Sequence, residues 1–162
     1  MTNIIHFQYD AVENIVYEKI EGHYFLHLPA FFSTDGHANA LISFVLDTGA
    51  YLTVISRDTA TRFGFDKIPP INTNLPLSGF AGGCNADLVE IPGLIVGGRM
   101  LEGVKVAIPQ EINGINLLGL NILEYFNYLI DSNNSKIYFA MNDNYKIPEI
   151  LKCAKVRAIS SH

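Results

Sequence analysis

Asp47, Thr48 and Gly49 are the residues of this chain best suited to chemistry, and they follow one another directly. A carboxylate held in a tight turn by backbone and hydroxyl donors can exchange protons with a bound water or a substrate. The glycine permits such a turn and lets a second backbone come close. The hydroxyl beside the aspartate can hydrogen bond across a boundary between subunits. These three residues therefore predict a site for general acid–base catalysis.

A surface turn is the alternative interpretation of this motif, because aspartate and glycine are common in turns. The motif also arises by chance in roughly a few per cent of chains this long. The flanking residues favour the catalytic interpretation. The nearly continuous apolar run Ala40–Leu46 precedes Asp47, and the apolar pair Val54-Ile55 follows it. A charged residue between two buried strands is costly unless it is hydrogen bonded or functional.

The elements that would position this motif are mainly β-strands. Short β-branched or aromatic runs alternate with glycine, proline and asparagine, which is typical of strands joined by turns. Glu21-Gly22, Gly97-Gly98 and Asn133-Asn134 mark three of the turns. The predicted hairpins pair residues 15–20 with 24–28, 75–80 with 85–91, 94–96 with 100–108, and 127–131 with 136–141.

Helical signals are few. Ser56 is a good N-cap and Gly64 a good helix stop, so we predict a helix of about two turns between them. A second short helix is expected over residues 120–126, whose apolar side chains share one helical face. The segment 142–162 carries no clear pattern apart from a helical signal after Pro148. We therefore expect one domain over residues 1–141 and a C-terminal tail over 142–162; the resemblance described below implies a core of about 24–141.

Two further motifs follow the aspartate in the sequence. A glycine-rich segment, Gly79-Phe80-Ala81-Gly82-Gly83, joins two predicted strands. On its own it is most simply a hairpin turn. A phosphate-binding loop is excluded because Cys84-Asn85 stands where Gly-Lys-Ser/Thr would be required. The second motif is a pair of leucines and a glycine, Leu117-Leu118-Gly119, ahead of the second predicted helix.

In this order the three motifs resemble the retropepsins and their cellular and bacterial relatives, over roughly residues 24–141. The resemblance implies a mainly β, closed-barrel acid-protease (retropepsin-like) fold, with one lobe per chain and one or two short helices. It also implies a role for each motif. The implied site residues are Asp47 as the catalytic carboxylate, Thr48, Gly49 and Ala50 as its support, Gly79, Phe80, Ala81, Gly82 and Gly83 as a flap over the substrate, and Leu117, Leu118 and Gly119 as a buttress.

The chain contains no second Asp-Thr/Ser-Gly; Asp131-Ser132-Asn133 comes closest and is better explained as a polar turn. The implied enzyme is therefore a homodimer in which two copies of Asp47 meet on a twofold axis. Two adjacent carboxylates share one proton and activate water to hydrolyse a peptide bond, without a metal or another cofactor. The partners would be a second copy of the chain and a peptide or protein substrate. Viral relatives dimerise through terminal strands, and the longer N-terminal segment here leaves the mode of dimerisation open.

The composition excludes several other classes of protein. The net charge is −5, from 11 basic and 16 acidic residues, and no basic run is present to bind nucleic acid or an anionic membrane. Apolar stretches of about ten residues are too short to span a bilayer. Two cysteines and the lack of a signal-peptide pattern predict a cytoplasmic protein.

Other candidate residues have simpler interpretations. His23 and His27 are expected on a strand, without the His-Glu-x-x-His pattern of a zinc site, so no metal site is predicted. Cys84 could make the flap redox-sensitive, although an inert thiol is the better interpretation. Phe80 fits a substrate contact and a core position equally well, and we expect Leu52 and Ile115 near the substrate cleft. A catalytically silent module for dimerisation or peptide binding would carry the same motifs, and a β-barrel with a fortuitous Asp-Thr-Gly is a third alternative.

Overall fold

The structure is a computed structural model, and it describes residues 8–34, 39–79, 82–111 and 114–159. These residues form strands with a few short helical segments between them. The helical segments are α1 (Arg57–Phe63), α2 (Leu120–Leu123) and the 3-10 turns η1 (Phe65–Lys67) and η2 (Glu149–Leu151). The strands are β1 (Ala11–Asn14), β2 (Val16–Ile20), β3 (His23–Phe32), β4 (Ala40–Leu46), β5 (Asn72–Gly79), β6 (Gly82–Val96), β7 (Arg99–Pro109), β8 (Leu117–Leu118), β9 (Phe126–Asp131), β10 (Lys136–Met141) and β11 (Lys155–Ala158).

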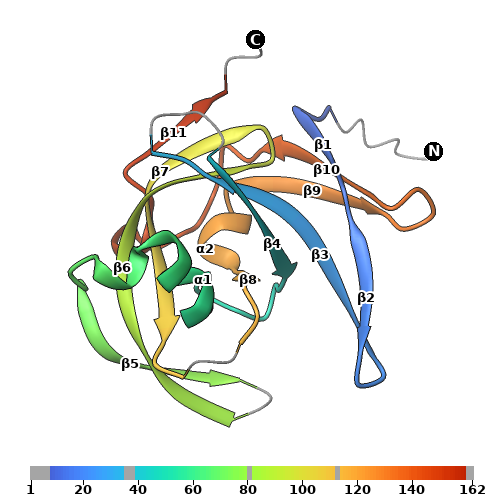
Figure 1. Ribbon diagram of the computed structural model, residues 1–162. Coiled ribbons are helices and arrows are strands. Elements are labelled where there is room, and N and C mark those ends of the chain that lie inside the picture. The colour runs from blue at the N-terminus through green and yellow to red at the C-terminus, as the bar shows by residue number, and fades with distance from the viewer. Residues whose placement is uncertain (1–7, 35–38, 80–81, 112–113, 160–162) are drawn as a thin grey trace.

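Two sheets make up the fold. The larger has the order β11-β7-β6-β3-β4-β8, with β2 added to β3 and β5 added to β6. The smaller has the order β1-β10-β9. The larger sheet curls around α2 as a half-barrel (Figure 1). The predicted mainly β fold with two short helices is therefore confirmed.

The core fills the inside of this curl. Alternate residues of each strand point inward, as the period of a half-buried strand requires. Phe44 of β4, Ile91 of β6 and Phe139 of β10 are all fully buried there, together with Ile122 of α2. Because both sheets and α2 contribute to one continuous cluster, the strand that leads to Asp47 is packed from several sides.

The predicted hairpins form, with one difference in length. β2 and β3 meet at a two-residue turn in which Glu21 (φ 49°) and Gly22 (φ 85°) both have positive φ. Residues 85–91 and 94–96, predicted as separate strands, belong to the single strand β6. Gly93 lies within this strand. Only glycine fits at this position, because a Cβ would lie 2.9 Å from the Ser33 carbonyl oxygen.

The first predicted helix is confirmed at both ends. Ser56 Oγ accepts a hydrogen bond from the Thr59 N–H, and Gly64 ends the helix in the left-handed region. The second predicted helix, over residues 120–126, was too long. α2 ends at Leu123, and Phe126 instead begins β9, where it pairs with Met141 and packs edge-on against Phe139. Pairing with a strand distant in sequence thus overrides the local helical pattern.

The segment after Met141 folds back onto the rest of the chain. Ile147 is buried in the core, and η2 follows Pro148. The Cys153 N–H then donates a hydrogen bond to the Tyr125 hydroxyl. β11 finally pairs antiparallel with the start of β7.

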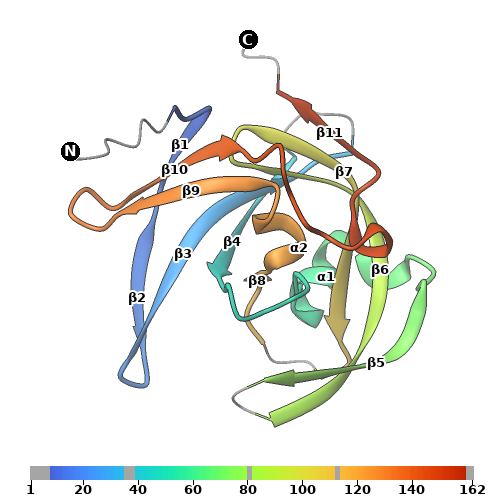
Figure 2. The ribbon, with the colours of Figure 1, turned by 180° about the vertical axis from the view of Figure 1, so that it is seen from behind.

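Two hairpins extend past the end of β4. The β2–β3 hairpin and the β5–β6 hairpin project on the same side of the molecule, one on each side of the chain that follows β4, and both views show this arrangement (Figures 1 and 2). In the part of the chain that the structure describes, no helix has the length and hydropathy needed to cross a membrane.

Candidate active site

Asp47 stands directly after β4, in a turn built from its own backbone. Its N–H donates a hydrogen bond of 3.1 Å to the Leu118 carbonyl, and its carbonyl accepts one of 3.3 Å from the Ala50 N–H. Its side chain is half-buried. The turn therefore fixes the backbone of Asp47 against β8 and leaves the carboxylate at the surface of the core.

The two carboxylate oxygens of Asp47 have different surroundings. Oδ1 accepts a 2.8 Å hydrogen bond from the Gly49 N–H. No donor among the described residues is hydrogen bonded to Oδ2, and Thr48 beside it is exposed. A Cβ on Gly49 would lie 3.1 Å from Oδ1, so a larger residue would press on the oxygen that the turn holds. One oxygen is thus fixed while the other is free to meet a partner group.

β8 is inserted between β4 and the chain that leaves the turn. Leu117 and Leu118 pair in parallel with Val45 and Leu46 of β4. On its other side, Leu117 exchanges two backbone hydrogen bonds of 2.9 Å with Val54. The predicted buttress therefore lies directly against the turn of Asp47. The predicted short strand Val54-Ile55 is reduced to bridges at Val54, with Leu117 and with Ala107.

Gly119 is required by close packing rather than by its backbone angles. A Cβ at this position would lie 2.6 Å from the Leu52 carbonyl carbon and 2.8 Å from the Thr53 nitrogen. Real side chains do not approach backbone atoms so closely. The Gly119 N–H also donates a 3.1 Å hydrogen bond to Oγ1 of the fully buried Thr53. The glycine thus lets the chain ahead of α2 pack directly on residues 52 and 53.

Asn121 is a supporting residue that the motifs did not single out. Its Oδ1 accepts a 2.7 Å hydrogen bond from the Thr53 N–H, and its amide donates one of 2.9 Å to the Lys105 carbonyl. Its own N–H donates to the Tyr51 carbonyl at 3.1 Å, and the Leu120 N–H donates to the Ala50 carbonyl at 2.8 Å. The sequence signal for this role is a single asparagine among the apolar residues at the start of the helix. In the structure Asn121 is 3 % exposed, and a buried polar side chain needs such hydrogen bonds.

The predicted flap falls on the tip of the β5–β6 hairpin. Gly79 and Gly82 are the last pair of the two strands, and Gly83 follows in β6. A Cβ on Gly83 would lie 3.2 Å from the Leu77 carbonyl oxygen, so the strands approach closely here. Phe80 and Ala81 lie outside the described residues, and both interpretations of Phe80 remain open.

The other residues expected near the cleft differ in exposure. Leu52 is buried in a small cluster with Ala86, Leu88 and Ala107, beneath the base of the β5–β6 hairpin. Leu52 therefore packs against residues at the base of this hairpin. Ile115, by contrast, is exposed. Within the described ranges, no group of three or more His, Cys, Asp or Glu side chains could hold a metal ion.

Comparison with known proteins adds two findings. The family model described as "gag-polyprotein putative aspartyl protease" matches residues 35–125, a span that contains all three motifs. The fold is similar to the crystal structure of a retropepsin-like aspartic protease from Rickettsia conorii, with a TM-score of 0.53 and 22% sequence identity, over 84% of this chain and 96% of that one. No curated protein matches the chain.

Proposed function

The chain belongs to the family of gag-polyprotein putative aspartyl proteases, and on this premise we propose that it is an aspartic endopeptidase whose active site is completed by a second copy of the chain. The observation that carries this proposal is the unequal bonding of the Asp47 carboxylate. Oδ1 is held by the Gly49 N–H at 2.8 Å, while Oδ2 has no donor among the described residues. A carboxylate with one fixed and one free oxygen can serve as half of a catalytic pair.

The second carboxylate would come from Asp47 of another copy. Twofold symmetry places two identical turns face to face, with Thr48 at the boundary. Two carboxylates a few ångströms apart cannot both ionise cheaply, so the pair would hold one proton between them. The backbone bonds that fix residues 47–53 to β8 and α2 would keep this geometry once the copies associate.

The reaction then follows from the shared proton. The ionised Asp47 takes a proton from a water bound between the two carboxylates, and the water oxygen attacks the carbonyl carbon of the peptide bond. The protonated Asp47 gives its proton to the carbonyl oxygen. The resulting tetrahedral intermediate collapses when the C–N bond breaks and the leaving nitrogen receives a proton. This chemistry would need no metal or other cofactor.

An extended peptide or protein segment is the substrate that this arrangement fits. The β5–β6 hairpin would cover it and exclude water, with Gly79, Gly82 and Gly83 near the tip. The cytoplasm is the compartment that we propose, because Cys84 and Cys153 are both free thiols.

The decisive experiment compares cleavage of a peptide library by the wild-type chain and by Asp47→Asn. The asparagine oxygen can still accept the Gly49 N–H, so the fold is expected to persist while hydrolysis falls at least about a thousandfold. Asp143→Asn, which changes an exposed aspartate in a turn, is the matched control and should keep full activity. Undiminished cleavage by Asp47→Asn would sink the assignment. A folded wild type that cleaves no library peptide would favour a silent module.

A further inference from the structure

The β2–β3 hairpin carries an unpaired edge on the side of residues 47–53, which we call the catalytic turn after the function proposed above. We call residues 16–27 of this hairpin the arm. The last pair between β3 and β4 is His27 with Val45, whereas β3 stays paired with β2 to its first residue. Within the described residues, the backbone edge of residues 23–26 that faces away from β2 therefore has no strand beside it (Figures 1 and 2).

The strand register directs this edge toward Asp47. The pairing of β3 with β4 ends at His27 and Val45, and continuing it by two residues would set Phe25 opposite Asp47. Opposed residues of antiparallel strands are about 5 Å apart, so the continued register would bring Phe25 about that close to Asp47. Four further residues of strand carry the arm on by roughly 13 Å.

The arm exposes apolar side chains on both of its faces. Val16 and Ile20 point to one face, and Tyr17 and Tyr24 to the other, as the alternation of the strands requires. Tyr24 is 70 % exposed and Val16 is 64 % exposed. A two-stranded ribbon without a covered face is marginally stable in water. Apart from Leu26, which packs against the core, the apolar side chains of the arm therefore lack a packing partner among the described residues.

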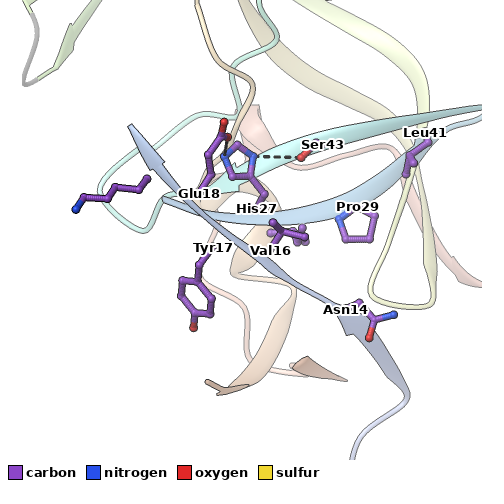
Figure 3. Close-up of a pocket in the computed structure, with 10 residues that line it drawn as sticks. Asn14, Val16, Tyr17, Glu18, His27, Pro29, Leu41 and Ser43 are labelled. Atoms are coloured by element: carbon purple, nitrogen blue, oxygen red, sulfur yellow. Dashed lines mark hydrogen bonds and ion pairs between the residues drawn. The ribbon is translucent and has the colours of Figure 1, made fainter. Parts of the chain in front are cut away.

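Polar contacts nevertheless fix the arm to the body of the protein. His27 Nε2 lies 2.8 Å from Glu18 Oε2, although the contact is not aligned as a hydrogen bond, and His27 Nδ1 lies 3.1 Å from Ser43 Oγ of β4 (Figure 3). The Tyr17 hydroxyl is 3.0 Å from Ser132 Oγ, in the β9–β10 turn. Lys19 lies over the Tyr24 ring. Glu18 and Lys19 thus have partners within the arm, while the side chains of Val16, Ile20 and Tyr24 are exposed and available for docking.

We propose that the arm is a contact surface for a second copy of this chain, at the edge of the active site that the two copies share. This inference rests on the proposed function, because it uses the position of the twofold axis. If two Asp47 carboxylates share a proton, each lies within a few ångströms of that axis. With the register of β3 and β4 continued, Phe25 at the base of the arm would be only about 5 Å further away. The partner would cover the unpaired edge of residues 23–26 and the apolar side chains beside it.

A groove at the base of the arm is a second surface that a partner could use. It has a volume of about 660 Å³, and the residues that line it include Val16, His27, Pro29 and Leu41 (Figure 3). Leu41, which is 62 % exposed, marks its outer end. Leu41 is six residues before Asp47 along β4, or roughly 20 Å of extended strand, so we favour the arm as the contact.

The test measures the mass of the full-length chain against concentration by analytical ultracentrifugation, in an Asp47→Asn background so that the readout does not depend on cleavage. The double variant Ile20→Lys/Tyr24→Glu changes both faces of the arm and leaves the net charge unchanged. Glu at position 24 stands opposite Lys19, so the arm itself is preserved. We expect the dissociation constant of the dimer to rise at least about tenfold. The control, Leu41→Lys/Ile150→Glu, changes an exposed side chain of the groove and one of η2, both outside the arm, and should leave the dissociation constant unchanged.

The outcomes separate this inference from the proposed function. A dimer that survives the arm variant, or that the control variant weakens as strongly, overturns the arm as the contact and leaves the peptidase proposal standing. A dimer that the arm variant dissociates supports the arm even if library cleavage is never observed. A wild-type chain that is monomeric at every concentration overturns both. Circular dichroism of each variant shows whether the strands are retained.

Discussion

The two hairpins beside the catalytic turn are held in opposite ways. The β5–β6 hairpin rests on a small apolar cluster that includes Leu52 and Leu88, and Leu52 belongs to the catalytic turn itself. Within the described residues, the arm packs only Leu26 against the core, and polar contacts of His27 with Ser43 and of Tyr17 with Ser132 tie it to the rest of the chain. Apolar packing joins the β5–β6 hairpin to the core of the chain. The arm, in contrast, directs several apolar side chains toward solvent. Among the described residues, the first hairpin is thus packed on a buried cluster of its own chain, whereas the second leaves most of its apolar side chains exposed.

Gly119→Ala should have the largest effect on stability, because it displaces Leu52 from the cluster that supports the β5–β6 hairpin. The new methyl group would lie 2.6 Å from the Leu52 carbonyl carbon, so either α2 or the catalytic turn must move. We expect a loss of about 3 kcal/mol or more in the free energy of unfolding, measured by urea denaturation. Gly114→Ala, where the nearest atom is 4.0 Å away, is the control. If Gly119→Ala is as stable as that control, residue 119 does not pack as closely on Leu52 and Thr53 as described.

Leu88→Ala tests the cluster directly. Leu88 is 8 % exposed at the base of the β5–β6 hairpin, and its removal should lower the free energy of unfolding by about 2–3 kcal/mol. The matched change in the arm, Val16→Ala, should cost less than about 0.5 kcal/mol in the monomer because Val16 is already exposed. Thermal unfolding at a concentration low enough to keep the chain monomeric compares the two. Equal losses in the free energy of unfolding would show that the two hairpins do not differ in how much apolar packing stabilises them.

Gly22→Ala tests whether the turn between β2 and β3 controls the stability of the arm. Nothing lies within 4 Å of a Cβ at this position, but its φ of 85° is unfavourable for alanine. We expect a loss of about 1 kcal/mol, confined to the arm, and faster amide hydrogen exchange in β2 and at the start of β3. Gly22→Asn, which tolerates the left-handed region, should cost less. Unchanged exchange in Gly22→Ala would mean that the turn does not control the arm.

Glu18→Gln has the smallest expected effect. It removes the charge that faces His27 but keeps the length of the side chain. An exposed ion pair contributes about 0–1 kcal/mol, so stability should change little. The arm should instead become more mobile relative to β4, which NMR relaxation of the residues 16–27 would detect. Lys67→Gln in η1 is a distant control. A rigid arm in Glu18→Gln would show that the contact between Glu18 and His27 does not fix it.

Local patterns predicted the parts of the fold that depend on neighbouring residues. The turn at Glu21-Gly22 and the caps of α1 follow from residue types within a few positions, and the structure has them where predicted. The aspartate, glycine-rich and Leu-Leu-Gly motifs predicted which segments meet around the site, through their resemblance to a family. Contacts between distant segments were not predictable in this way. The hydrogen bonds of Asn121 to Thr53 and Lys105, and the early end of α2 at Leu123, depend on pairings that no local window contains.

The insertion of β8 beside the catalytic turn has a consequence for the order of folding. The hydrogen bonds from Gly119 to Thr53 Oγ1 and from Thr53 to Asn121 join residues 66 and 68 positions apart. During synthesis, Asp47 therefore emerges long before the segment that fixes its turn. Contacts so distant in sequence form late and slow the folding of a domain. We expect nascent chains that end before residue 117 to lack a fixed catalytic turn, so the site would be assembled only when nearly the whole domain has left the ribosome.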